Sequence, residues 1–153
     1  MPRALIALAM VALLYLPSAA QSKDKTAVTT TVQHFVDSFN KGDTDAAKAV
    51  CAEQTAIIDE FPPYQWNGTG ACAKWMADFD TDAKKNIITD PAVTLGTPRH
   101  VDVAGDRAYV VVPADYSFKQ NGKPMKETAS TLTIVLRKSA GGWRISAWSW
   151  SKS

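Results

Sequence analysis

The chain has little of what metal and hydrolase sites require: only two histidines and two cysteines in 153 residues. His34 and His100 stand apart, outside any H-E-x-x-H spacing. Cys51 and Cys72 have no histidine near them in sequence, and two thiols alone do not make a zinc site. No G-x-S-x-G elbow occurs. The G-x-G-x-x-A pattern from Gly68 follows two prolines rather than a strand, so it is not a dinucleotide fingerprint. We therefore expect no metal and no cofactor.

The sequence also lacks a strong charge of either sign. Seventeen Lys and Arg residues stand against fifteen Asp and Glu residues, and the formal net charge is +2. A mixed, nearly neutral surface gives no electrostatic reason to bind nucleic acid or an anionic membrane. We expect neither as a partner.

No apolar run is long enough to cross a bilayer. The longest covers residues 4–16, short of the roughly 18 to 20 residues that a membrane-spanning helix needs. Arg3 precedes this run, Pro17 breaks it, and Ser18-Ala19-Ala20 supplies the small residues that a signal peptidase recognises. We predict a signal peptide over residues 1–20, export to the periplasm or the medium, and no membrane attachment afterwards. An uncleaved anchor or a buried core helix is the alternative.

Residues 21–153 suffice for one domain and are too few for two. In an oxidising compartment Cys51 and Cys72 are more often bridged than free. Such a bridge would stabilise the fold by about 3 kcal/mol, mainly by restricting the unfolded chain. Two buried, unpaired thiols are the alternative.

The apolar periodicity is helical in the first half of the chain. It predicts helices over residues 28–39, 46–51 and 72–79, with Asp43 as N-cap of the second. The third helix is expected to start within Asn67-Gly68-Thr69. A short strand over residues 55–59 separates the second helix from the third.

From residue 92 the period becomes that of strands. Strands are expected over residues 93–103, 107–118, 128–137 and 143–150, with Asn121-Gly122 as a hairpin turn. Pro113 predicts a bulge or a sheet edge. Alternation places Trp148 and Trp150 on one face of the last strand and Trp143 on the other. Helices followed by a strand meander indicate an α+β domain.

Two stretches of the sequence carry a family resemblance. "VQHFVDSFNKGDTDAAKAVCAEQTAIIDEFPPYQWNG" and the terminal "GGWRISAWSWSKS" resemble the nuclear transport factor 2-like superfamily, which includes ketosteroid isomerases and SnoaL-type polyketide cyclases. The resemblance spans Val28 to Trp150. It implies a cone-shaped, cystatin-like fold, in which three N-terminal helices pack on a curved, mostly antiparallel sheet around one apolar pocket.

The resemblance places Asp59 where ketosteroid isomerases keep their general base. Phe35 occupies the position of their hydrogen-bonding tyrosine, and residues 128–136 contain no acid where they keep a protonated one. Loss of one oxyanion donor commonly costs about a hundredfold in rate, so steroid isomerisation is not expected. Alternatively, Asp59 and Glu60 cap a turn imposed by Pro62-Pro63.

The leading hypothesis is an exported protein that binds a small apolar or amphipathic molecule in one pocket. An isomerase, cyclase or lyase with Asp59 as general base is the alternative, and a module that forms homodimers through the outer sheet face is the third. This scaffold hosts many functions, so fold alone does not choose. The candidate ligand-binding residues are Phe35, Tyr64, Trp66, Tyr109, Tyr116 and Trp148.

Overall fold

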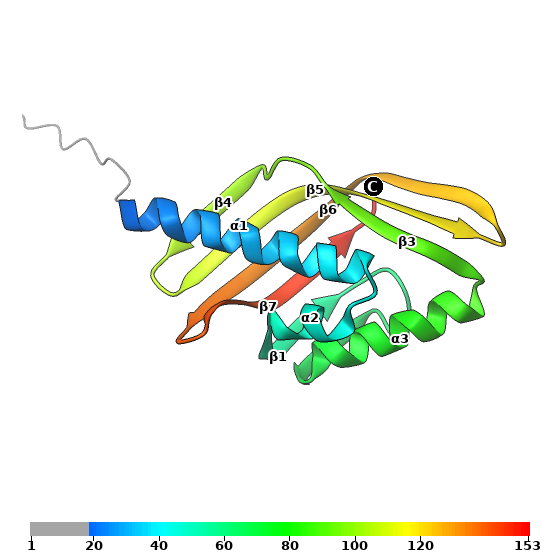
Figure 1. The fold of residues 1–153 in the computed structure, drawn as a ribbon, viewed down its shortest axis with the longest axis horizontal. Coiled ribbons are helices and arrows are strands. Elements are labelled where there is room, and N and C mark those ends of the chain that lie inside the picture. Colours follow the sequence, from blue (N-terminus) through cyan, green and yellow to red (C-terminus); the bar gives the residue numbers. More distant parts are fainter. Residues whose placement is uncertain (1–18) are drawn as a thin grey trace, which may run out of the picture.

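The computed structural model describes residues 19–153 (Figure 1). The signal peptide predicted over residues 1–20 lies outside the described residues except for Ala19 and Ala20, which begin the first helix. Within residues 19–153 no helix combines the length and the apolarity needed to cross a membrane.

Among the described residues there are three helices, as predicted: α1 (Ala19–Asn40), α2 (Thr44–Ala49) and α3 (Ala71–Lys85). Asp43 caps α2, because its side chain accepts a hydrogen bond from the backbone N–H of Ala46 at 3.0 Å. The second helix begins and ends two residues earlier than predicted. Cys51 already belongs to strand β1 (Cys51–Ile58), where it pairs with Ile145 of the last strand.

The predicted start of the third helix was wrong. Asn67, Gly68 and Thr69 lie in strand β2 (Gln65–Thr69), which pairs antiparallel with β1. Gly70, with φ of 71°, then turns the chain into α3. Pairing with β1 supplies hydrogen bonds along this segment, so its tertiary partner overrides the local helix-start signal.

The remaining strands are β3 (Ile88–Leu95), β4 (His100–Ala104), β5 (Arg107–Gln120), β6 (Lys123–Ser139) and β7 (Gly142–Ser151). The sheet order is β2-β1-β7-β6-β5-β3, and β4 also pairs with β5. Only the β1–β7 pair is parallel. The single strand predicted over residues 93–103 is therefore two strands, β3 and β4, which share β5 as neighbour.

Two bulges bend the long strands. One lies opposite Ala114 and Tyr116 of β5, where two steps along β5 face three along β6, so the extra residue is on β6. Pro113 keeps its regular pairing with Thr131 and β5 is not at an edge, so the bulge or edge predicted at Pro113 itself was wrong. The other lies in β7, where the register with β6 shifts between Ile145 and Ala147. This second bulge reverses the alternation, so the predicted opposite facing of Trp143 was wrong. Trp143 is buried and donates a hydrogen bond to Asp24 of α1.

The helices cover one face of the curved sheet (Figure 1). Helix α1 contacts β3, β4 and β7, and α3 contacts β1, β2 and β3. The predicted disulfide is present between Cys51 of β1 and Cys72 of α3. The α+β prediction is confirmed, and the core lies between this sheet face and the helices. Its most deeply buried side chains are Val28, Ile57, Val110, Val112, Ile134, Leu136 and Ile145.

Candidate functional site

A cavity of about 220 Å³ lies between the helices and the sheet, near the ends of β1 and β7. Half of its eighteen lining residues are aromatic, and four others are acidic, against a single lysine. The aromatic residues are Phe35, Phe39, Phe61, Trp75, Phe79, Tyr116, Phe118, Trp148 and Trp150. The charged residues are Asp59, Glu60, Asp82, Glu127 and Lys152.

Asp59 follows the last residue of β1 and lines this cavity. One of its carboxylate oxygens accepts the backbone N–H of Glu60, and the other accepts the indole N–H of Trp75, each at 2.7 Å. Burial raises the pKa of Asp59 to about 6, against the lowering effect of both hydrogen bonds, and the charge of Glu127 raises it further. One oxygen of Asp59 therefore accepts a backbone N–H at the turn, as the structural alternative expects, and Asp59 also lines the cavity.

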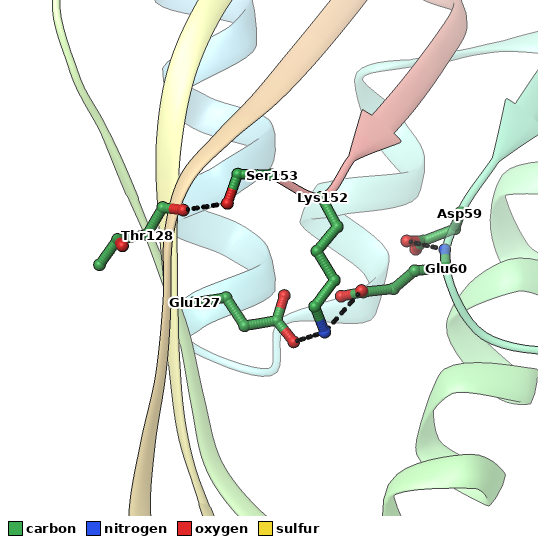
Figure 2. Close-up of polar contacts among 6 residues, drawn as sticks. All are labelled: Asp59, Glu60, Glu127, Thr128, Lys152 and Ser153. Atoms are coloured by element: carbon green, nitrogen blue, oxygen red, sulfur yellow. Dashed lines mark hydrogen bonds and ion pairs between the residues drawn. The ribbon is translucent and has the colours of Figure 1, made fainter.

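Two further carboxylates, those of Glu60 and Glu127, meet at the same end of the cavity (Figure 2). The ammonium of Lys152, just beyond β7, pairs with Glu127 of β6 and lies 3.3 Å from Glu60 after β1. Burial, followed by the neighbouring Glu127, raises the pKa of Glu60. Ser153 donates to the carbonyl of Thr128 at 2.8 Å and ties the end of the chain to β6. Lys152 therefore joins an acidic group of β6 to one in the segment that follows β1.

The expectation that the penultimate strand carries no acid was wrong, because β6 begins at Lys123 rather than Thr128. Glu127 lies on this extension, directly opposite Tyr116 of β5. Residues 123–127 are mostly exposed and show no apolar alternation, so the pattern concealed the strand. The Asn121-Gly122 signal could have revealed it, since a two-residue turn implies that both strands reach the turn.

Several buried polar atoms near the cavity have no hydrogen-bond partner among residues 19–153. They are Tyr116 Oη, Glu127 Oε2, Trp148 Nε1 and Trp150 Nε1, and all four residues line the cavity. Burial, together with the surrounding carboxylates, raises the pKa of Tyr116. Buried polar groups are normally paired, so a cluster of unpaired ones calls for an explanation such as an absent ligand.

The structure brings some predicted site residues together and separates others. Phe35, Tyr116 and Trp148 line the cavity with Asp59. Trp66 is buried beside it, but its indole donates to Asp78 of α3.

Tyr64 and Tyr109 are 57% and 43% exposed and do not line the cavity. Sequence reasoning missed Trp75 and Trp150 as lining residues, although Trp75 lies within the third helix predicted over residues 72–79. Apolar periodicity identifies a buried face without distinguishing a filled core from a cavity wall. In the described part of the chain, no group of three or more His, Cys, Asp or Glu side chains is placed to hold a metal ion.

Solved structures similar to this one share its fold. A nuclear transport factor 2-like protein of Salmonella enterica is 20% identical, with a TM-score of 0.72 over 86% of this chain and 92% of the other. A nuclear transport factor 2-like protein with a cystatin-like fold from Novosphingobium aromaticivorans is 17% identical, with a TM-score of 0.70 over 86% and 82%. A ketosteroid isomerase-like protein of Erwinia carotovora is 19% identical, with a TM-score of 0.67 over 85% and 96%.

Among curated proteins no significant match to the sequence was found. The model of the SnoaL-like domain family, in contrast, matches residues 28–152. This range contains every residue that lines the cavity. The chain therefore belongs to the SnoaL-like domain family, and its fold is that of the nuclear transport factor 2-like proteins.

Proposed function

We propose that the cavity binds a small, largely apolar molecule whose polar group lies at the end formed by Asp59, Tyr116 and Glu127. The observation that carries this proposal is the set of unpartnered polar atoms on residues that line an aromatic cavity. Leaving a buried donor or acceptor unpaired costs about 1 to 3 kcal/mol. A ligand that pairs with these groups would recover that free energy, while its apolar part would contact the rings.

A specific observation supports a second candidate, proton transfer by Asp59. A general base works best when its pKa lies near the operating pH, and burial brings the pKa of Asp59 to about 6. Trp75 holds one carboxylate oxygen in place. The hydroxyl of Tyr116 and the indole N–H groups of Trp148 and Trp150 are free to stabilise a negative oxygen on a substrate. These groups suit an isomerase, cyclase or lyase.

Export belongs to the same proposal. The Cys51–Cys72 disulfide is of the kind that persists in oxidising compartments. Together with the predicted signal peptide over residues 1–20, it supports a role in the periplasm or outside the cell.

Native mass spectrometry of protein purified from its own host tests the binding proposal. We expect a bound small molecule on the wild-type chain and none on Val93→Trp, since Val93 lines the cavity. The matched control is Val111→Trp, because Val111 is a half-buried strand valine that does not line the cavity. Near-ultraviolet circular dichroism should show that both variants fold. An empty wild-type cavity, or equal occupancy in both variants, would argue against the proposal.

Deuterium exchange tests the catalytic candidate with the same co-purified molecule. Incubated in heavy water with the wild-type protein, the molecule should gain deuterium at a carbon-bound position. Asp59→Asn should slow this exchange by about a hundredfold or more while binding persists. Exchange at an equal rate in the variant would exclude Asp59 as the base and leave the binding proposal standing.

A further inference from the structure

We infer that the molecule bound in this cavity is a cation, an ammonium ion with an aromatic or aliphatic body, rather than a neutral or anionic compound. The inference rests on the proposed binding function and specifies the class of ligand. Three independent features of the described residues support it: the balance of charge, the arrangement of the rings and the unpaired acceptor atoms.

The charge balance comes first. Four carboxylates line the cavity and only one cation, Lys152, does so. The ammonium of Lys152 is already shared between Glu60 and Glu127. Among residues 19–153, Asp59 and Asp82 have no ion-pair partner. The cavity thus holds two carboxylates that no protein cation neutralises, and a ligand cation would supply the missing positive charge.

The rings make the cavity suitable for a cation. Trp75 and Trp148 meet edge to face, with their centroids 4.8 Å apart, and the Phe35 ring lies 6.1 Å from each of them. The faces of aromatic rings carry negative potential, and a cation within about 6 Å of a ring centroid gains roughly 0.5 to 2 kcal/mol. Trp75, Trp148 and Phe35 are three of the nine aromatic residues that line the cavity, and aromatic rings are the groups with which proteins recognise ammonium ligands.

Of the four unpaired atoms in the cavity lining, Glu127 Oε2 and Tyr116 Oη can accept hydrogen bonds from a ligand, whereas the indole N–H groups of Trp148 and Trp150 can only donate them. Tyr116 and Glu127 lie opposite each other on β5 and β6, and both line the cavity. Tyr116 is only 9% exposed, and neither its hydroxyl nor Glu127 Oε2 has a partner among residues 19–153. A carboxylate oxygen accepts hydrogen bonds and a phenol oxygen can do so, so both atoms suit an ammonium N–H.

The negative potential of the four carboxylates that line the cavity acts on Tyr116. Glu127, Glu60, Asp59 and Asp82 all raise the pKa of Tyr116 through their charges, after burial. A neutral ligand would leave this negative potential unrelieved, and an anion would be repelled by it.

The experiment compares three probes of similar shape on the purified mature protein by isothermal titration calorimetry. They are benzylammonium, its uncharged carbon isostere ethylbenzene, and the anion phenylacetate. Near pH 8 we expect the cation to bind at least about tenfold more tightly than the isostere, and phenylacetate most weakly. Below about pH 6 the preference for the cation should shrink, because Asp59 takes up a proton. The other charged groups that face the site are the acids Glu60, Asp82 and Glu127 and the cation Lys152.

Variants of single carboxylates test whether the acids that line the cavity, rather than the charge of the whole protein, cause the preference for the cation. Asp82→Asn and Glu127→Gln should each weaken binding of the cation by about three- to tenfold, because each removes a carboxylate from the lining, and should leave the isostere unchanged. Asp80→Asn is the matched control. Asp80 lies on the same helix, is exposed, pairs with Lys84 and does not line the cavity.

If the isostere binds as tightly as the cation, the inference is overturned while the binding proposal stands. Binding of none of the probes, together with an empty cavity in protein from the host, would overturn both. A preference for the cation that persists unchanged in Asp82→Asn and Glu127→Gln would also contradict the inference, since the selectivity would then arise elsewhere.

Discussion

The indole N–H of Trp75 donates to Asp59 across 2.7 Å and joins α3 to the end of β1 at the cavity wall. A charged acceptor strengthens such a bond. The bond fixes the direction of the carboxylate and partly offsets the cost of burying it. Trp66 makes a similar bond to Asp78, with a length of 2.8 Å. With the bond from Trp143 to Asp24, residues 19–153 contain three indole–carboxylate pairs, of which only the Trp75–Asp59 pair has its carboxylate in the cavity lining.

Trp75→Phe should raise the pKa of Asp59 further above 6, by up to about one unit, because the ionised carboxylate loses its indole donor. Trp66→Phe is the matched control: it removes the donor of Asp78 and should leave the pKa of Asp59 near 6. Carbon-13 NMR titration of the Asp59 carboxyl measures both variants. The account is wrong about this bond if the two variants give the same midpoint.

Asp59→Asn should stabilise the protein at high pH. The pKa of Asp59 is 3.8 in the unfolded chain and about 6 in the folded protein. Between these two values Asp59 is ionised in the unfolded chain but still protonated in the folded protein, so the free energy of unfolding falls as the pH rises. Above about pH 6 the penalty is constant, roughly 3 kcal/mol. Asparagine does not ionise but loses about 1 kcal/mol of hydrogen bonding. We expect a net gain of about 1 to 2 kcal/mol near pH 8 that disappears near pH 4.

Urea denaturation across this pH range measures the difference between the variant and the wild type. Asp37→Asn on α1 serves as the control, since Asp37 does not line the cavity. A difference between Asp59→Asn and the wild type that stays constant with pH would show that Asp59 does not carry the ionisation penalty.

Lys152→Met should destabilise the protein slightly at high pH, because Glu60 and Glu127 would then face each other without a cation. The Lys152 side chain is 56% exposed, so water screens its ion pairs and the loss should stay below about 1 kcal/mol. The pKa of Glu60 should rise further, and the loss should vanish as the pH falls and Glu60 takes up a proton. Lys152→Arg should retain the wild-type stability. The loss in Lys126→Met, which removes an exposed pair with Asp115, should persist to lower pH, because Lys126 lowers the pKa of Asp115 whereas the pKa of Glu60 is raised.

Removing the disulfide by Cys51→Ala and Cys72→Ala should cost about 3 kcal/mol of unfolding free energy, since it frees the intervening loop in the unfolded chain. Chemical denaturation measures this loss. Reducing the wild-type protein should cause a similar loss and increase its intact mass by about 2 Da. No effect of reductant on either mass or stability would contradict the assignment.

The signal peptide over residues 1–20 remains a prediction, and the N-terminus of the protein produced by its own host tests it. Cleavage after Ala20 would leave Gln21 as the first residue. Intact mass and N-terminal sequencing of protein recovered from the periplasm or the medium would identify this end. Recovery of the chain only in membranes, with residues 1–20 attached, would support the uncleaved anchor instead.

The sequence predicted the fold well where local signals and tertiary partners agree. The helical spacing of Val28, Val32 and Phe35 and the cap at Asp43 correspond to α1 and α2. The prediction failed where a neighbouring strand, rather than the local sequence, determines the structure of a segment. Asn67 to Thr69 form a strand because β1 lies beside them, and the facing of Trp143 depends on a bulge that alternation does not reveal.

Asp59 was identified from its place in the family pattern, whereas Glu127 and Lys152 were not. Glu127 lies on an exposed hairpin extension without apolar alternation, and Lys152 follows the last strand. Both lie at the cavity because of the three-dimensional path of β6 and β7 (Figure 2). Residues placed by strand length and curvature, rather than by local periodicity, are difficult to predict from one sequence.

The most direct test of the central claim, that Asp59 belongs to the wall of a ligand cavity, is the carbon-13 titration of its carboxyl group with and without saturating benzylammonium. We predict a midpoint near pH 6 in the free protein, from the burial of Asp59, and a lower midpoint with the cation bound. A midpoint near the ordinary value of 3.8 that does not respond to the probe would contradict the account.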